Sequence, residues 1–363
     1  MTIYLDYQAT TPLAPEAFEA MVPLLRDQFA NPHSPHRPGR MAAAQVELAR
    51  EEVGRLLPDG GRLLFTSGAT EALNLAIQGA PPGGIVTLAT EHAAVLDTAA
   101  AQGAKGRAVT VLPVGPDGLV DLEAAAEAIR PGTALVAAML VNNEIGVIQP
   151  IAPLADLAHR AGALFLCDAV QGYGRVPIPP QCDIVAVSAH KIHGPKGVGA
   201  LWLRDGVDLD PVLHGGGQEG GLRSGTLSPA LCAGFGVAAR LMRERAEEDR
   251  AHVERLWAEA RGLFQNWTLN GSAEARYHGN LNIRRAGVDG ARLLSECRDV
   301  AFSLGSACAS GSGRPSHVLR AIGLKDREAR GSVRIGFGRY TTLDEVRDAA
   351  RLMNEAAAAQ AAP

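Results

Sequence analysis

The chain has 363 residues, of which 47% are hydrophobic and 20% are charged, a composition typical of a globular protein with one large core or two smaller ones. Its formal net charge of −4, with acidic and basic residues interspersed, gives no basic stripe for direct nucleic-acid binding. Because no run of about 18 apolar residues and no basic, apolar leader occurs, we expect a cytoplasmic protein without membrane segments.

Short apolar runs alternate with stretches of helical periodicity from residue 62 onward. Seven runs are predicted to be strands: 62–66, 84–88, 109–114, 135–141, 163–168, 183–188 and 199–203. Between them, residues 71–78, 122–129 and 151–161 carry apolar side chains at helical spacing. This alternation predicts an α/β fold whose mostly parallel seven-stranded sheet is covered by helices on both faces.

The pattern changes near Pro229, where a helical and increasingly charged stretch continues to Phe264. We expect one long helix here that bridges two lobes. Beyond it, strand-like NLNIR and SVRIGFG segments lie among helical patterns at 289–297, 315–322 and 342–358, which predicts a smaller α+β domain. The expected division is a large domain of residues 13–246 and a small domain of residues 1–12 and 247–363.

Polar residues follow four of the predicted strands. They are Ser67-Gly68-Ala69-Thr70 after the first strand, Asn142-Asn143-Glu144 after the fourth, Asp168 at the end of the fifth, and Ser188-Ala189-His190-Lys191 after the sixth. Ligands of parallel sheets bind at the carboxyl ends of the strands. These segments are therefore predicted to converge on one site.

Lys191 is one of only four lysines, with Lys105, Lys196 and Lys325. It follows an apolar strand in SAHKIHGPKG, where Ser188 and His190 can hold a phosphate while the amine reaches an aldehyde. For this peptide alone, a surface lysine after a strand is the simpler interpretation.

Two further segments can be interpreted together with this lysine. In FTSGATEALNLAI (65–77), a strand, a turn of small residues and a helix follow one another, so free amides at the helix start can hold an anion, with the hydroxyl of Thr70 beside them. An ordinary capped helix explains this segment equally well. Asp168 either caps a structural group or keeps a pyridine nitrogen protonated, which makes that ring an electron sink.

Five cysteines form no CxxC pair, so we expect no disulfide framework and no metal site. Four of them lie in apolar or helical contexts that predict buried packing: Cys167, Cys182, Cys232 and Cys297. Cys308 instead lies in SLGSACASGSGRPS, whose glycines and serines predict a mobile loop at 303–314.

Nine segments, in order and in wording, resemble the cysteine desulfurases of the class V aminotransferase family, in particular the housekeeping and nitrogen-fixation type (group I). They are YLDYQATTP (4–12), FTSGATEALNLAI (65–77), EHAAVLD (91–97), VNNEIGVIQP (141–150), CDAVQ (167–171), SAHKIHGPKGVGAL (188–201), HGGGQEGGLRSGT (214–226), LGSACASG (304–311) and SVRIGFGRYTT (332–342). The resemblance covers nearly the whole chain. It implies the pyridoxal 5'-phosphate (PLP)-dependent transferase fold of type I and a catalytic homodimer.

The resemblance also implies a role for each matching residue. Lys191 would carry PLP as a Schiff base and move the substrate Cα proton, and His92 would stack on the ring and assist proton transfer. The other cofactor contacts would be Asp168 at the pyridinium nitrogen, Gln171 and Asn143 at the phenolic oxygen, and Ala69, Thr70, Ser188 and His190 at the phosphate, with Thr226 from the second subunit. Arg334, with Asn143, would bind the substrate carboxylate, because a guanidinium gives two parallel charge-assisted bonds.

For Cys308 the resemblance implies sulfur transfer. L-cysteine would be converted to L-alanine, with the sulfur held as a persulfide on Cys308 and passed to an iron-sulfur scaffold protein or a tRNA-thiolation carrier. Two enzyme alternatives remain open: a selenocysteine lyase, and another class V activity that does not need Cys308. A catalytically silent binding protein is a third, although the unsubstituted set of site residues argues against it.

Overall fold

The structure is a computed structural model that describes residues 2–304 and 316–361. Cys308 and most of the predicted loop at 303–314 therefore lie outside the described residues. The described start of that loop differs from the prediction, because Ser303–Leu304 forms strand β12, which pairs with Arg334 and Val333. Within the described ranges, no helix is both long and apolar enough to cross a membrane.

All seven predicted strands join one sheet, with ends that differ from the prediction by at most two residues. In spatial order the strands are β2 (Gly61–Thr66), β8 (Gly199–Arg204), β7 (Ile184–Ser188), β6 (Leu164–Asp168), β5 (Thr133–Met139), β3 (Gly84–Leu88) and β4 (Val109–Leu112). Only β8 runs against its neighbours, so the sheet is mostly parallel as predicted. Its central strands are continuous apolar runs because both faces are covered.

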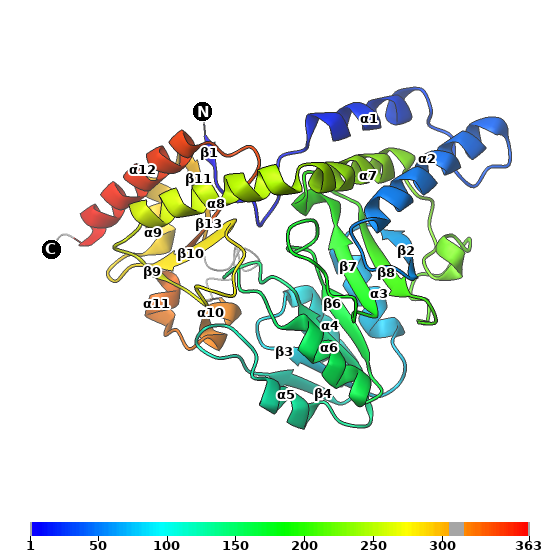
Figure 1. The fold of residues 1–363 in the computed structure, drawn as a ribbon, viewed down its shortest axis with the longest axis horizontal. Helices are drawn as coiled ribbons and strands as arrows, with labels where there is room; N and C mark the ends of the chain where they lie inside the picture. Colours follow the sequence, from blue (N-terminus) through cyan, green and yellow to red (C-terminus); the bar gives the residue numbers. More distant parts are fainter. Residues whose placement is uncertain (1, 305–315, 362–363) are drawn as a thin grey trace.

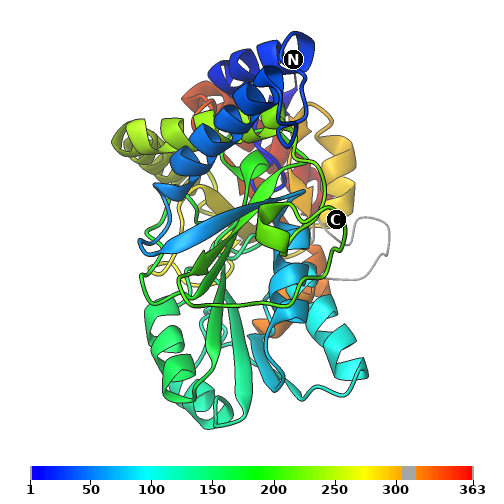
Figure 2. The same cartoon turned by 90° about the vertical axis from the view of Figure 1, so that its right-hand side faces the viewer.

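Helices cover the two faces of this sheet (Figures 1 and 2). They are α2 (Arg37–Gly54), α3 (Ala69–Gly79), α4 (Ala93–Ala104), α5 (Leu122–Ala128), α6 (Ile151–Arg160) and α7 (Pro229–Glu244), and α1 (Pro15–Arg26) packs against α7. Along β5, Val136 joins the core that contains Phe235 of α7, whereas Leu135 joins the core that contains Leu73 of α3. Alternate residues of one strand thus pack into cores on opposite faces.

A second, antiparallel sheet has its own core. It contains β12, β13 (Ser332–Gly336), β10 (Asn280–Arg284) and β9 (Thr268–Leu269), and beside it β1 (Ile3–Tyr4) pairs in parallel with β11 (Val300–Ala301). The helices of this part are α8 (Ala246–Leu263), α9 (Gly290–Glu296), α10 (His317–Ala321), α11 (Asp326–Arg330) and α12 (Leu343–Ala361). Leu5 from the start of the chain packs into this core with Phe264 and Phe337.

The prediction of a single long helix over 229–264 is wrong, because the segment forms two helices, α7 and α8, that are divided at Arg245. Arg245 has φ −107° and ψ 13°, which lies outside the helical region. The division follows from packing: α7 lies against α1 and α2, whereas α8 packs against α12 (Figure 1). An ion pair from Arg339 to Asp249 at 2.6 Å fixes the start of α8.

Tyr173 offers a test of the packing against α2. Its buried hydroxyl donates a 2.6 Å hydrogen bond to the carbonyl oxygen of Val53, near the end of that helix. Tyr173→Phe leaves that carbonyl without this donor. We expect the free energy of unfolding, measured in urea, to fall by about 1–2 kcal/mol. Tyr340→Phe, at a residue that is 38% exposed, is the control and should change it by less than about 0.5 kcal/mol. Equal effects of the two substitutions would contradict the assigned bond.

Candidate active site

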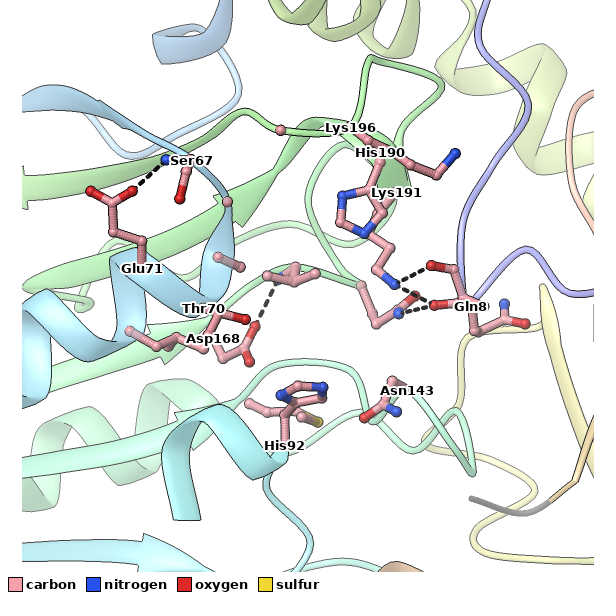
Figure 3. Close-up of a pocket in the computed structure, with 18 of the residues that line it drawn as sticks. Gln8, Ser67, Thr70, Glu71, His92, Asn143, Asp168, His190, Lys191 and Lys196 are labelled. Carbon is pink, nitrogen blue, oxygen red and sulfur yellow. Dashed lines mark hydrogen bonds between the residues drawn. The ribbon is translucent and has the colours of Figure 1, made fainter. Parts of the chain in front are cut away.

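A cavity of about 530 Å³ lies at the carboxyl ends of β5, β6 and β7, beside the start of α3. This volume is within the range of roughly 300–1,000 Å³ that small-molecule sites occupy. The lining includes nine predicted site residues: Ala69, Thr70, His92, Asn143, Asp168, Gln171, His190, Lys191 and Arg334. The convergence predicted from the strand ends is thus found in the structure (Figure 3).

Lys191 ends a short 3₁₀ turn that directly follows β7. Its Nζ donates to the backbone carbonyl oxygens of Gln8 at 2.6 Å and Ala9 at 2.7 Å. A guanidinium nitrogen of Arg175 bonds the carbonyl oxygen of Lys191 itself. The amine is therefore oriented by carbonyl dipoles of the N-terminal segment, a contact that the sequence did not predict (Figure 3).

Asp168 ends β6 and is almost completely buried. Its Oδ1 accepts a 3.0 Å hydrogen bond from the backbone N–H of Val170. Burial raises the pKa of this carboxyl above its ordinary value, against the opposing effects of the Val170 N–H and the charges of His92 and Lys191. A cationic group in the cavity would offset the cost of burying this carboxylate in its charged form.

The start of α3 forms a cradle for an anion. Its N-cap is Gly68, which has no side chain to bond the first helical N–H groups and has φ +156°, where a side chain would be strained. A Cβ added at Gly199 would meet the Cα of Gly68 at 2.7 Å, so only glycine lets β8 run this close to the turn. Glu71 fixes the turn, since it accepts from the Ser67 N–H at 2.6 Å and pairs with Arg223 at 2.6 Å.

His190 completes this side of the cavity. Its Nδ1 lies 2.9 Å from the hydroxyl of Ser188, which does not itself line the cavity but supports the ring. Burial, with smaller effects from the charges of Lys191 and Lys196, lowers the pKa of His190 to about 4. The ring is therefore neutral near pH 7. Lys196, which sequence analysis did not assign to the site, also lines the cavity.

His92 is the N-cap of α4 and enters the cavity opposite Lys191 (Figure 3). Its Nδ1 accepts a 3.0 Å hydrogen bond from the backbone N–H of Ala94. In the neutral ring, the proton therefore lies on Nε2. The helix start thus sets the tautomer of this histidine.

Arg334 reaches the same cavity from β13 of the second sheet. It is 1% exposed, and its Nη2 pairs with Asp6 at 2.7 Å while its Nη1 donates to the carbonyl oxygen of Asn143 at 3.1 Å. Gln171 contacts the N-terminal segment through Nε2, which donates to the Gln8 carbonyl oxygen at 2.9 Å. The cavity is therefore built by both sheets and by residues 6–9.

Of the twelve predicted site residues, Ser188 and Thr226 do not line this cavity. Thr226 is exposed and does not line it, whereas it was expected to act in a second subunit. Cys308 lies outside the described residues. The other four cysteines are buried, as predicted, and burial raises the pKa of Cys232 to about 12.

The fold is that of the type I PLP-dependent transferases. The chain belongs to the Aminotransferase class-V family, whose model matches residues 3–348. It is 45% identical over 360 residues to the mitochondrial cysteine desulfurase of Saccharomyces cerevisiae, an alignment that covers 95% of this chain and 72% of the yeast protein. The family predicted from the nine segments is confirmed.

Solved structures agree with this assignment. One described as a NifS-like protein superimposes with a TM-score of 0.90 and 32% identity, over 98% of this chain and 99% of that one. Another, SspA in complex with cysteine, gives a TM-score of 0.83 and 34% identity, over 94% of this chain and all of that one (100%).

Glu144, which follows β5 in the segment VNNEIG, lies just behind this cavity and is 3% exposed. Burial raises its pKa to about 7 from an ordinary value of 4.5, although the Ser316 hydroxyl and the charges of Arg334 and His92 oppose the shift. Its contribution to stability is thus fully present below pH 4.5 and is lost as the pH rises through about 7.

Glu144→Gln should remove this pH dependence, because glutamine stays neutral and still accepts a hydrogen bond from Ser316. Between pH 5 and pH 8, we expect the variant to lose less unfolding free energy than the wild type, by on the order of 1–3 kcal/mol. Urea unfolding at both pH values measures this. Glu47→Gln, at a 62% exposed side chain, should behave as the wild type does. Identical pH dependence in the wild type and Glu144→Gln would show that the assigned titration is incorrect.

Proposed function

We propose that this chain is a PLP-dependent cysteine desulfurase, which converts L-cysteine to L-alanine and holds the sulfur as a persulfide on Cys308. The observation that carries the proposal is that Lys191 and Arg334 line one cavity. An amine that can bind an aldehyde thus lies beside a guanidinium that can bind a carboxylate. The names of the yeast relative and of the cysteine complex of SspA support L-cysteine as the substrate.

The residues of the cavity fit PLP. The buried carboxyl of Asp168 would hold the pyridinium nitrogen, and the helix start at Ala69–Thr70, with Ser188 and His190, would hold the phosphate. Asn143 and Gln171 would contact the phenolic oxygen. When bound, PLP supplies an aldehyde and an electron-withdrawing ring that stabilises negative charge at the substrate Cα.

The chain's own groups would then act on the substrate. Arg334 binds the cysteine carboxylate and thereby orients the Cα bonds, because its guanidinium offers a planar pair of donors. Lys191 Nζ takes the Cα proton, and the Gln8 and Ala9 carbonyl oxygens that now hold the amine set its direction. His92 carries a proton on Nε2 that can serve the same transfers.

Sulfur leaves the substrate by attack of the Cys308 thiolate. A new S–S bond forms as the substrate C–S bond breaks, and the electron pair of that bond remains on the carbon part, which is protonated to alanine. Cys308 then bears the persulfide, whose outer sulfur an acceptor thiol can take up. An iron-sulfur scaffold protein or a tRNA-thiolation carrier is the proposed acceptor, and the cytoplasm is the proposed compartment.

We also propose a homodimer in which Thr226 reaches the phosphate of the partner's cofactor. The exposed position of Thr226 on this chain is compatible with such a role. Apolar side chains exposed along α1, α2 and the link between them supply a surface that a second copy can cover: Phe18, Leu25, Phe29, Met41 and Leu48.

The proposed domains are 13–246, and 1–12 with 247–363, a division supported by the separate core around Phe264 and Phe337.

Cys308→Ala tests the proposed sulfur chemistry. The purified variant should keep the yellow colour of bound PLP but lose alanine and sulfide release from cysteine, in the presence of a reductant, by roughly 100-fold or more. Lys191→Ala should fail to form the yellow species at all. The matched control is Cys297→Ala, at a buried cysteine, which should retain activity. Full desulfurase activity in Cys308→Ala would refute the proposal.

Arg334→Lys tests substrate recognition. Lysine keeps the charge but loses the planar pair of donors, so the KM for cysteine should rise by roughly 10-fold to 100-fold while the colour is retained. Cysteamine, which lacks the carboxylate, is the comparison substrate. The wild type should discriminate strongly against it, and the variant should lose most of that discrimination. An unchanged preference for cysteine in the variant would remove Arg334 from carboxylate binding.

A further inference from the structure

One oxygen of Asp6 holds two residues that are far apart in the sequence. Its Oδ1 accepts from Arg334 Nη2 at 2.7 Å and from the hydroxyl of Ser303 at 2.8 Å. Ser303 is also directly opposite Arg334 in the pairing of β12 with β13. The guanidinium that lines the cavity and the strand that precedes residues 305–315 thus share one carboxylate.

The carboxylate of Glu144 holds Ser316, the residue that follows residues 305–315. The Ser316 hydroxyl donates to Glu144 Oε2, and the same hydroxyl caps α10 by accepting from the Leu319 N–H at 3.1 Å. The neighbouring Asn143 carbonyl oxygen accepts from Arg334 Nη1. Ser303 is therefore linked to Nη2 of Arg334 through Asp6. Ser316 is linked to the Nη1 side through Glu144 and its neighbour Asn143.

His317 adds a third contact on this side. Its Nε2 lies 2.9 Å from the backbone carbonyl oxygen of Glu91, the residue before His92. The Glu91 side chain is buried and accepts from the Met139 N–H at 2.9 Å, at the end of β5. The Ser316 side is thus anchored to two loops that line the cavity.

We infer that Asp6 and Glu144 are positioning residues, which fix Ser303 and Ser316 to the Arg334 site and so hold the flanks of the segment that carries Cys308 in register with the bound substrate. This inference rests on the proposed function and extends it from the cavity to the supports of the thiol. Arg334 is buried, so it needs a counter-charge, and Asp6 supplies it. Because the Asp6 carboxylate bonds both Arg334 and Ser303, the position of the guanidinium is coupled to that of β12.

The two roles of Asp6 predict different kinetic effects. Ser303→Ala and Ser316→Ala remove the flanking contacts but leave Arg334 paired with Asp6. Each should lower kcat for alanine release by roughly tenfold, because the attacking thiol is less well placed, while the KM for cysteine stays within about twofold. Asp6→Ala should both raise KM and lower kcat, since it also frees the guanidinium.

A double-mutant cycle and a rescue separate this role from general destabilisation. Adding Ser303→Ala to Asp6→Ala should lower kcat no further, because both substitutions remove one contact. Ser303→Thr keeps the hydroxyl and should restore kcat. Ser295→Ala, at an exposed serine of α9, is the matched control. The single-turnover rate of persulfide formation on Cys308, followed by mass spectrometry, should fall in parallel with kcat.

Failure of this inference is distinguishable from failure of the proposed function. If the wild type releases no alanine from cysteine, the proposed function is wrong and the inference falls with it. If the wild type is active but Ser303→Ala and Ser316→Ala keep its kcat, only the inference is overturned. Additive losses in the cycle, or no rescue by Ser303→Thr, would also overturn it.

Discussion

The site depends on one constraint, which is that a buried guanidinium from one sheet and a lysine amine from the other must lie in the same cavity. Residues 6–9 meet this constraint, because Asp6 pairs with Arg334 while the Gln8 and Ala9 carbonyl oxygens hold Lys191 Nζ. Leu5, next to them, is buried in the core of the second sheet. A short N-terminal segment thus fixes the distance between the group that would bind the aldehyde and the group that would bind the carboxylate.

Burial also governs the charges around this cavity. It is the largest cause of the raised pKa of Asp168 and Glu144, and of the lowered pKa of His190. In such surroundings a ligand's own charges interact strongly with the side chains, because little water is present to screen them. A pyridinium beside Asp168 would favour the ionised carboxylate, so binding of the cofactor and ionisation of this group would support each other.

The sequence predicted the parts of this structure that have local causes. The strands were recognisable because the central ones, which are buried on both faces, are continuous apolar runs. Eight of the nine predicted residues that line the cavity converge because they lie at or after the carboxyl ends of strands in this sheet, whereas Arg334 lies on β13. The Asp6–Arg334 pair joins residues 328 positions apart, and no local pattern indicates it. The break at Arg245 has no proline or glycine to mark it, because packing of α7 and α8 against different partners sets it. The five residues of α11 are too few to show a period.

The buried cysteines bear on where sulfur can go. A thiol attacks as its thiolate, and burial raises the pKa of Cys297 and that of Cys232, the latter to about 12. The pKa of Cys167 is raised by its hydrogen bond with Cys182 and by burial. Cys182 lies in the same core cluster as Cys167 and is also enclosed. None of these four is therefore suited to take sulfur from a ligand in the cavity. Their packing therefore excludes the four described cysteines as carriers, so the proposed reaction assigns the transferred sulfur to the remaining cysteine, Cys308.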